Sequence, residues 1–495
     1  ATSKLKWIGM NLTGQKPTLK SDKYVFIKTY GCQMNVYDSN RMFELLQPLS
    51  YNKTDSPDHA DLIILNTCHI REKATEKVFS ELGRLKKLKL SAANKKRKVL
   101  IGVAGCVAQA EGEEILERAP YVDLVFGPQT YHRLPEMVNK ALKMDLSLVA
   151  DSQIIETEFA TEQKFDELST DSISPTNSFL TIQEGCNKFC SFCVVPYTRG
   201  AEISRPAGQV LEEAGKLVKS GAKEITLLGQ TVNAYHGVSS NGKEWSLGRL
   251  IRELAELDGL ERIRYTTSHP KDMDDDLISA HGEVPKLMPY LHLPVQSGSN
   301  TILKHMNRKH DVTFYRLIID KLRKAREDMA FSSDFIVGYP GETDADFAET
   351  LRLVSDIEFA QAYSFKYSSR PGTPASGKVE VDEQLKSDRL ESLQQLLNAQ
   401  QLAFNLKKVG TVQNVLVEKH GRKQGQLVGK TPYMQAAHFC GNEQLIGSIQ
   451  KVRILDGFSK GISGDMVDND KFYDIKEPSK ICLLYTSPSP RDGLL

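Results

Sequence analysis

Residues 184–200 read EGCNKFCSFCVVPYTRG and place Cys186, Cys190 and Cys193 in a C-x3-C-x2-C pattern. The segment directly follows an apolar run at residues 179–183, which predicts a β-strand. Three thiolates can hold three irons of a 4Fe–4S cube and leave the fourth iron open, whereas a structural zinc site normally has four closed ligands. The motif therefore predicts an open iron–sulfur centre just beyond the end of a strand.

The chain after this motif continues as a repeat of strands and helices. Amphipathic stretches at residues 210–219, 247–257 and 314–325 predict helices between the strands. This alternation predicts a βα repeat that closes into a full or partial barrel, with functional groups at the carboxyl ends of its strands. The predicted barrel strands cover residues 179–183, 224–228, 263–267, 290–295, 333–337 and 363–367.

The N-terminal part repeats a different pattern, in which an apolar run is followed by a cysteine and then by a helix-like stretch. Runs at residues 24–29, 61–66 and 99–104 come before Cys32, Cys68 and Cys106, and a fourth run covers residues 122–126. In an open parallel α/β sheet, functional groups gather beyond the carboxyl ends of the strands. We therefore predict that the three thiols converge on one sheet edge.

The length of 495 residues favours about three domains. A helix-like stretch at residues 383–406 leads into alternating runs with glycine-containing turns, typical of a small β-barrel. Residues 151–177 are acidic and rich in Ser and Thr, which predicts a linker. The predicted domains are residues 23–150, 178–405 and 406–470, followed by a tail at residues 471–495 that carries no readable pattern.

Charge and hydropathy exclude several classes of protein. The formal net charge is +1, so any basic surface must be local; residues 407–460 hold nine Lys or Arg against three Asp or Glu, a balance of +6. No apolar run of about 18 residues and no signal-peptide core are present. Eight cysteines are too few for a disulfide scaffold in a chain of this length. We predict a cytoplasmic protein with reduced cysteines and no membrane partner.

Several motifs together resemble the radical S-adenosylmethionine (SAM) methylthiotransferase family, and in particular its MiaB-type members that act on tRNA. The similarity covers about residues 23–467 and includes EGCNKFCSFCVVPYTRG at residues 184–200. The other similar motifs are TYGCQMN (29–35), NTC (66–68), GC (105–106), SRP (204–206), LLGQTVN (227–233), TTSHP (266–270), LHLPVQSGS (291–299), DFIVGYPGET (334–343) and RPGTPA (370–375).

The resemblance implies a fold class and two cofactors. The expected α/β fold has an N-terminal open parallel α/β sheet, a central radical SAM (βα)6 partial barrel, and a small all-β TRAM domain that is OB-like. The barrel cysteines, Cys186, Cys190 and Cys193, would hold the 4Fe–4S cluster that cleaves SAM. The N-terminal cysteines, Cys32, Cys68 and Cys106, would hold a second 4Fe–4S cluster that carries the transferred sulfur. Gln230, Ser268, Gln296 and Asp334 would contribute to SAM binding, although Gln and Ser near strand ends can instead cap helices.

The resemblance also implies a reaction and partners. Two SAM molecules would be used to attach a methylthio group to C2 of N6-isopentenyladenosine at position 37, beside the tRNA anticodon, with no proton-transfer residue. Partners would be a tRNA anticodon stem-loop, an electron donor such as a flavodoxin or ferredoxin, and a sulfur source. The predicted RNA contacts are Arg199, Arg205, Arg370, Lys408, Lys419, Arg422 and Lys423.

Alternatives remain open at three points. The three arginines in the barrel motifs could form salt bridges within the barrel, and a basic run at residues 84–98 is a second candidate RNA surface. The substrate could be threonylcarbamoyl-adenosine in tRNA or ribosomal protein S12. A non-catalytic RNA-binding metalloprotein is the alternative from a different functional class.

Overall fold

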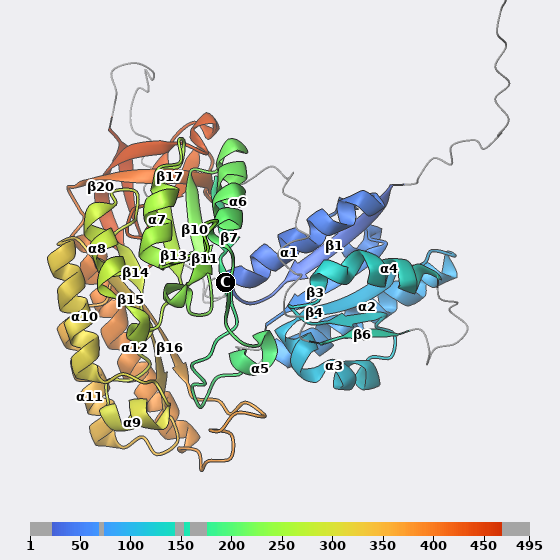
Figure 1. The fold of residues 1–495 in the computed structure, drawn as a ribbon, viewed down its shortest axis with the longest axis horizontal. Helices are drawn as coiled ribbons and strands as arrows, with labels where there is room; N and C mark the ends of the chain where they lie inside the picture. The colour runs from blue at the N-terminus through green and yellow to red at the C-terminus, as the bar shows by residue number, and fades with distance from the viewer. Residues whose placement is uncertain (1–21, 69–73, 144–152, 159–175, 468–495) are drawn as a thin grey trace, which may run out of the picture.

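The structure is a computed structural model that describes residues 22–68, 74–143, 153–158 and 176–467. An N-terminal α/β unit lies beside a central βα barrel, and a small β-barrel built from the C-terminal strands sits at one end of the central barrel (Figure 1). Helices α1 and α5 lie where the N-terminal unit meets the barrel. This confirms the predicted α/β fold class.

The N-terminal unit is a parallel sheet with strand order β2-β1-β3-β4-β5-β6. Its central strands read LIILNT and LIGVAG and are buried along their whole length, as expected for parallel strands covered on both faces. Helices α1 and α4 pack on one face, and α2 and α3 on the other. The elements are β1 Lys23–Thr29, α1 Gln33–Leu46, β2 Tyr51–Lys53, β3 Leu62–Thr67, α2 Ala74–Asn94, β4 Leu100–Gly105, α3 Cys106–Arg118, β5 Leu124–Phe126, α4 Leu134–Lys143 and β6 Ile154–Glu156.

Strand β6 corrects part of the predicted linker. Residues 154–156 pair in parallel with β5 and form the edge of the sheet, so they belong to the N-terminal unit. The composition of residues 151–177 concealed this strand, because Ile154 and Ile155 are flanked by polar residues and only Ile154 is buried. Residues 159–175 of the predicted linker and the tail at 471–495 lie outside the described residues.

The central barrel is an open arc of parallel strands split into two sheets, β7-β10-β13 and β14-β15-β16. The sheets meet at β13 and β14, where Ile263 and Leu287 form a single bridge. The strands are β7 Asn177–Thr181, β10 Glu224–Leu228, β13 Arg262–Thr266, β14 Tyr290–His292, β15 Ala330–Val337 and β16 Gln361–Lys366. The helices are α5 Val195–Arg199, α6 Ala207–Lys219, α7 Leu247–Ala255, α8 Asp275–Glu283, α9 Asn300–His305, α10 Val312–Ala325, α11 Asp344–Ile357 and α12 Glu383–Leu406.

The barrel helices start at well-formed N-caps. Ser246, Asp274, Ser299 and Asp311 each accept a hydrogen bond from the third backbone N–H of the helix that follows. Two short hairpins, β8 Gln183–Glu184 with β9 Ile203–Ser204 and β11 Gly237–Val238 with β12 Glu244–Trp245, interrupt the βα repeat. The first of them brackets the cysteine motif and fixes both ends of that loop.

The C-terminal barrel closes in the order β17-β18-β19-β21-β20. Its interior is filled by aliphatic side chains and Phe439. The strands are β17 Val412–His420, β18 Gln426–Lys430, β19 Ala436–Cys440, β20 Ile449–Phe458 and β21 Gly461–Met466. No helix among the described residues is both long and apolar enough to cross a membrane.

Candidate functional site

The barrel cysteines lie in the loop between β8 and α5. Gly185 starts this loop with φ +74°, and a Cβ there would lie 1.9 Å from the Ala201 carbonyl oxygen, so only glycine fits. The Cys186 N–H donates to the Gly200 carbonyl oxygen at 3.2 Å, and the Ser191 N–H donates to the Met306 carbonyl oxygen at 3.0 Å. The loop is therefore held at its start by its own hairpin and at its middle by the segment after α9.

Each barrel thiol has a polar neighbour. The Cys186 Sγ lies 3.3 Å from the Thr231 hydroxyl, the Arg308 Nη1 donates to the Cys190 Sγ at 3.5 Å, and the Val195 N–H donates to the Cys193 Sγ at 3.5 Å. Burial raises the pKa of Cys186, and burial together with the neighbouring Cys190 raises the pKa of Cys193 to about 12. Metal binding must therefore displace protons from Cys186 and Cys193.

The N-terminal cysteines all follow strands of the parallel sheet. Cys32 is the N-cap of α1, Cys68 comes directly after β3, and Cys106 is the first residue of α3. A Cβ on Gly31 would lie 2.1 Å from the Cys68 Cβ, so the turn before Cys32 touches the residue after β3. The structure brings together at one sheet edge the three residues that the sequence places far apart.

The surroundings shift the pKa values of Cys32 and Cys106 in opposite directions. A hydrogen bond with Cys68, and then the positive charge of Arg199, lower the pKa of Cys32 to about 6. Burial raises the pKa of Cys106, and Arg199 opposes that rise. Three clustered thiols beside a buried cation form a donor set that suits a metal cluster with an incomplete shell.

Each cysteine set has three thiols, the number that holds an iron–sulfur cube with one open iron. Among the described residues, no group of three or more His, Cys, Asp or Glu is arranged to hold a single metal ion. A cube spreads its thiolates over separate irons, so its ligands do not converge on one point. The assignment of these six cysteines as ligands remains a prediction.

Arg199 and Arg205 do not face solvent. Each is 3% exposed, and they form ion pairs with Asp38 and Glu213, at 2.8 Å in both cases. Buried cations paired with protein carboxylates are poorly placed to hold RNA phosphates. Arg205 pairs within the barrel, as in the salt-bridge alternative, whereas Arg199 pairs across the domain boundary with Asp38. Sequence reasoning could not separate the two roles, because Asp38 lies in another domain.

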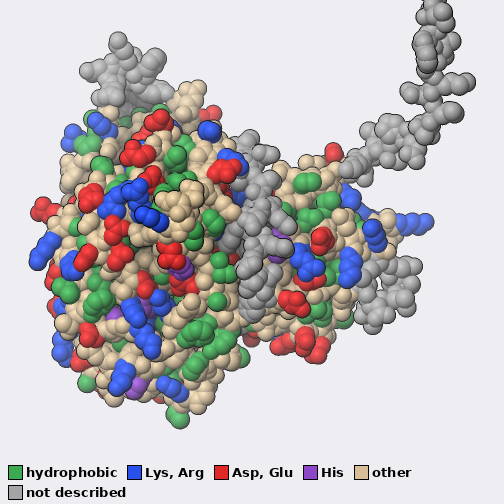
Figure 2. All heavy atoms as spheres, in the orientation of Figure 1, with side chains coloured by type: hydrophobic (Ala, Val, Ile, Leu, Met, Phe, Trp, Pro, Cys, Tyr) green, Lys and Arg blue, Asp and Glu red, His purple; other side chains and the backbone are tan. Residues whose placement is uncertain are grey.

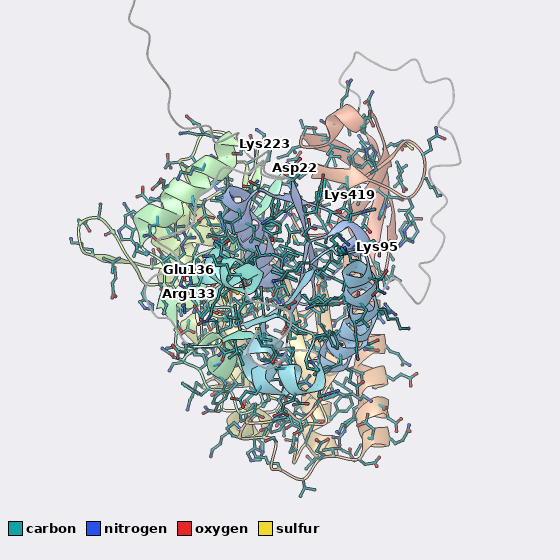
Figure 3. The ribbon with its side chains drawn as sticks, turned by 90° about the vertical axis from the view of Figure 1, so that its right-hand side faces the viewer. Asp22, Lys95, Arg133, Glu136, Lys223 and Lys419 are labelled. Carbon is teal, nitrogen blue, oxygen red and sulfur yellow. The ribbon has the colours of Figure 1, made fainter. Side chains whose placement is uncertain are left out.

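The other predicted RNA contacts lie nearer the surface. Arg370 is half-buried, and the Lys408 Nζ sits 3.7 Å from the centre of the Tyr433 ring, a cation–π contact. Lys419 and Arg422 are exposed and Lys423 is half-buried, and Figure 3 shows Lys419 on the C-terminal barrel. These positions remain predictions for RNA contact.

Three of the four predicted SAM contacts, Gln230, Ser268 and Gln296, follow the carboxyl ends of barrel strands, whereas Asp334 lies within β15. The Gln230 Oε1 accepts from the Gly185 N–H at 2.7 Å, and its Nε2 donates to the Met34 Sδ, so this side chain braces the cysteine loop against α1. The Ser268 hydroxyl is buried without a hydrogen-bond partner in the described structure. A buried polar atom of this kind is expected where a ligand completes the site.

The remaining two predicted SAM contacts, Gln296 and Asp334, lie on neighbouring segments. Gln296 has φ +78°. Its backbone N–H donates to the Asp334 carbonyl oxygen, and its carbonyl oxygen accepts from the Ile336 N–H, both on β15. The Asp334 carboxylate lies 3.5 Å from the His292 Nε2. Binding of SAM by these four residues remains a prediction.

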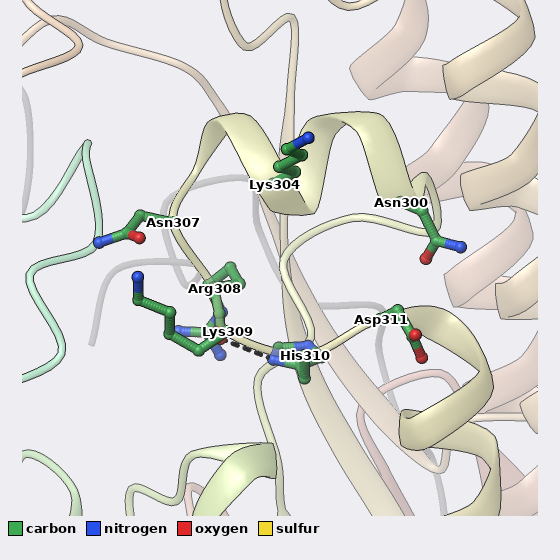
Figure 4. Close-up of a pocket in the computed structure, with 7 residues that line it drawn as sticks. All are labelled: Asn300, Lys304, Asn307, Arg308, Lys309, His310 and Asp311. Atoms are coloured by element: carbon green, nitrogen blue, oxygen red, sulfur yellow. Dashed lines mark hydrogen bonds between the residues drawn. The ribbon is translucent and has the colours of Figure 1, made fainter.

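Sequence reasoning missed a basic segment that reaches the barrel cysteines. Arg308, which contacts Cys190, also lines a pocket of about 390 Å³ that Figure 4 shows after α9. His269 and His310 stack edge to face with ring centres 5.6 Å apart, and burial lowers the pKa of both. The sequence MNRKH at residues 306–310 was the available signal, but nothing local connects it to a cysteine in another loop. The pocket is lined by Asn300, Lys304, Asn307, Arg308, Lys309, His310 and Asp311.

Comparisons with known families match three separate parts of the chain. Residues 24–127 match an uncharacterized protein family, UPF0004. Residues 180–354 match the radical SAM superfamily, and residues 406–464 match the TRAM domain. The radical SAM match implies SAM and a 4Fe–4S cluster.

Solved structures share the fold at low sequence identity. The cobalamin-dependent SAM radical enzyme OxsB superposes with a TM-score of 0.50 and 14% identity, over 76% of this chain and 56% of that one. The radical SAM methyltransferase TsrM from Kitasatospora setae gives a TM-score of 0.53 and 12% identity, over 72% of this chain and 75% of that one. This chain therefore spans little more than half the length of OxsB, and identities this low establish the fold alone.

Proposed function

Since the chain has the domain architecture that is the signature of MiaB-type methylthiotransferases among radical SAM enzymes, we propose that it methylthiolates C2 of N6-isopentenyladenosine 37 beside the tRNA anticodon. The product would be 2-methylthio-N6-isopentenyladenosine. The observation that carries the proposal is the packing of the two cysteine-bearing segments on each other, since α5, which follows the barrel cysteines, contacts α3, which begins at Cys106.

The residues of the chain would do three things in this reaction. The barrel cysteines and the N-terminal cysteines would each hold a 4Fe–4S cluster; when bound, one supplies the electron that cleaves SAM and the other the sulfur that is transferred. Gln230 would hold the barrel loop against α1, because its amide bridges Gly185 and Met34. The buried, unpartnered Ser268 hydroxyl would donate to SAM.

The C-terminal barrel would supply affinity for RNA. TRAM domains suggest RNA binding, and the +6 balance of residues 407–460 suits attraction to phosphate. An anticodon loop offers splayed, single-stranded bases, so the target adenine can leave the stack at low cost. An electron donor such as a flavodoxin or ferredoxin, and a sulfur source, would complete the system.

The test uses the anaerobically reconstituted full chain with an isopentenylated anticodon stem-loop, SAM and dithionite. Two variants accompany it, one with Cys186, Cys190 and Cys193 replaced by Ala and one with the N-terminal cysteines replaced by Ala. The first should lose deoxyadenosine formation, because it lacks the ligands of the cluster whose open iron would bind SAM. The second should keep about half of the iron and still cleave SAM.

The methylthio nucleoside, measured by mass spectrometry, should be absent in both variants. Modification of S12 or of threonylcarbamoyl-adenosine instead of the isopentenylated loop would replace the proposed substrate. RNA binding without SAM cleavage in the wild type would favour a non-catalytic metalloprotein.

A further inference from the structure

Arg199 enters the N-terminal cysteine site from the neighbouring domain. It is the last residue of α5, and its side chain is 2% exposed. The Arg199 Nη2 donates to the Asp38 Oδ2 at 2.8 Å and to the Asn35 Oδ1 at 3.2 Å. These two residues belong to α1, whose N-cap is Cys32.

The Asn35 side-chain oxygen links Arg199 to Cys32, because it accepts a hydrogen bond from each. The Cys32 Sγ also donates to the Asn35 Oδ1, at 3.4 Å. The amide of Asn35 is fixed in turn, because its Nδ2 donates to the Thr67 carbonyl oxygen, next to Cys68, at 2.8 Å. The guanidinium is thus anchored by the same side chain that ties together the ends of two cysteine-bearing segments.

The cation is surrounded by groups that carry or can acquire negative charge. Besides Asp38, the Glu184 Oε1 lies 3.7 Å from the Arg199 Nη1. The charge of Arg199 also acts on the thiols of Cys32 and Cys106. Thiolates that hold a cluster here would add anionic charge at a place from which water is excluded, where one unit charge has a large effect.

We propose that Arg199 is a positioning residue of the N-terminal cysteine site, supplied by the radical SAM domain, and that its charge raises the reduction potential of the cluster held there. The proposal rests on the proposed function, since it requires that Cys32, Cys68 and Cys106 hold a cluster. One-electron reduction adds one negative charge to that cluster, with the electron supplied by dithionite, and a fixed cation stabilises the reduced form. Removing the cation must therefore make reduction harder.

The experiment isolates the N-terminal cluster in the full chain by replacing the barrel cysteines with Ala. In this background, Arg199→Gln, Arg199→Lys and Asp38→Asn are reconstituted, and iron content and the midpoint potential are measured by anaerobic titration with EPR detection. Arg199→Gln should disfavour reduction at least tenfold, a shift of about 59 mV to lower potential. Arg199→Lys should recover most of that shift.

The direction of the potential shift in Asp38→Asn separates an effect of charge from an effect of a loosened structure. This variant removes a negative charge beside the same site and keeps Arg199, so the cluster should become easier to reduce. A change that merely loosened the domain interface would move the potential in the same direction for Arg199→Gln and Asp38→Asn. Shifts of the same sign, or no shift in Arg199→Gln, would overturn the proposal.

Arg205→Gln is the matched control, because it also removes a buried arginine, but one that pairs with Glu213 and donates to the Thr181 carbonyl oxygen within the barrel. Its midpoint potential should equal that of the background. If Arg199→Gln loses its iron while Arg199→Lys and Arg205→Gln keep theirs, the charge requirement is upheld. Equal iron loss in all three would show a structural role and overturn it. A background protein that holds no iron at all would instead refute the second cluster of the proposed function.

Discussion

A buried histidine couples the stability of the central barrel to pH. His281 on α8 is 1% exposed, and its Nε2 lies 2.6 Å from the Tyr265 hydroxyl on β13. Burial, with a smaller contribution from the charge of Arg326, lowers the pKa of His281 to about 3 from an ordinary value of 6.5. The folded chain therefore resists taking up a proton that the unfolded chain accepts below pH 6.5.

This difference in proton uptake gives the first prediction. A lowered pKa in the folded state stabilises the fold above pH 6.5, and the stabilisation is lost as the pH falls toward 3. Between pH 8 and pH 5.5 the His281 contribution to the free energy of unfolding should fall by about 1.4 kcal/mol. His281→Gln, which cannot charge, should lack this component in urea unfolding of the cluster-free chain.

The control is His420→Gln, because the His420 side chain is 64% exposed on the C-terminal barrel. Its pH dependence should match that of the wild type. An identical pH dependence in His281→Gln and the wild type would contradict the assignment.

At this scale the sequence predicts single residues well only where their neighbours are local. The barrel cysteines lie within one loop, so their spacing alone was enough to predict them as cluster ligands. The role of Arg199 depends on Asp38 in another domain and could not be inferred from spacing. Arg308 poses the same difficulty, because it lies far along the chain from the Cys190 thiol that it contacts.

At the scale of elements, β13 attaches the C-terminal barrel to the central one. Arg262 donates to the carbonyl oxygens of Lys430 and Asn414, at 2.9 and 2.6 Å. Arg264 donates to those of Pro432 and Thr431, at 2.9 Å each. The Arg264 Nε also pairs with the Glu224 Oε2 at 2.9 Å, and Glu224 is completely buried on β10.

The second prediction concerns this junction. Arg264→Met should lower the free energy of unfolding by about 3 kcal/mol, because it leaves the buried Glu224 charge without its nearest partner. Adding Glu224→Gln should recover part of the loss, since the uncompensated charge is then absent. Urea unfolding of both variants measures the effect.

Arg249→Met serves as the comparison, because Arg249 pairs with Glu253 on the exposed face of α7, and such pairs contribute less than about 1 kcal/mol. If Arg264→Met is as stable as Arg249→Met, the buried Glu224 does not need the charge of Arg264, and the prediction is wrong.

Elements with strong apolar patterns were predicted, and those built around small residues were missed. The predicted runs before the cysteines correspond to β1, β3 and β4, which are rich in Val, Ile and Leu. Strand β21 reads GISGDM, which has little β-propensity. At Gly464 the backbones of β21 and β20 approach so closely that an added Cβ would lie 2.1 Å from the Arg453 carbonyl oxygen. Glycine therefore suits this position because of its neighbour strand and not because of its β-propensity. Such close approach is a tertiary property that a single strand does not reveal.

Across the whole molecule, positive and negative side chains are mixed. Figure 2 shows Lys and Arg interspersed with Asp and Glu over the visible face, in keeping with the net charge of +1. An RNA footprint must therefore come from a local group of cations. Lys419 lies near the end of β17, and Arg422 and Lys423 lie in the turn before β18; Lys419 and Arg422 are exposed.

The third prediction is that replacing Lys419, Arg422 and Lys423 with Gln weakens binding of the anticodon stem-loop and reduces its salt dependence. If all three contact phosphate, the slope of log K against log salt should fall by roughly two units. Fluorescence anisotropy at several salt concentrations measures it. These substitutions are a better test than deleting the chain from Lys408, because deletion would expose the buried Arg262 and Arg264.

The control replaces Lys86, Lys87 and Lys95 on the basic run of α2 and the turn after it, with Lys95 labelled in Figure 3. If the slope of log K against log salt is unchanged in the C-terminal variant and reduced in this control, the RNA-binding surface lies on the N-terminal domain.

The cysteine loop runs directly into α5, and this limits how the two domains can be recombined during evolution. Residues 186–199 carry all three barrel cysteines and also Arg199, which sits beside Cys32 and Cys106. A recombination event that joined this N-terminal domain to an unrelated barrel would bring three cysteines without their cation. It would also leave Asp38 buried and unpaired. The two domains are therefore expected to have descended as a single unit.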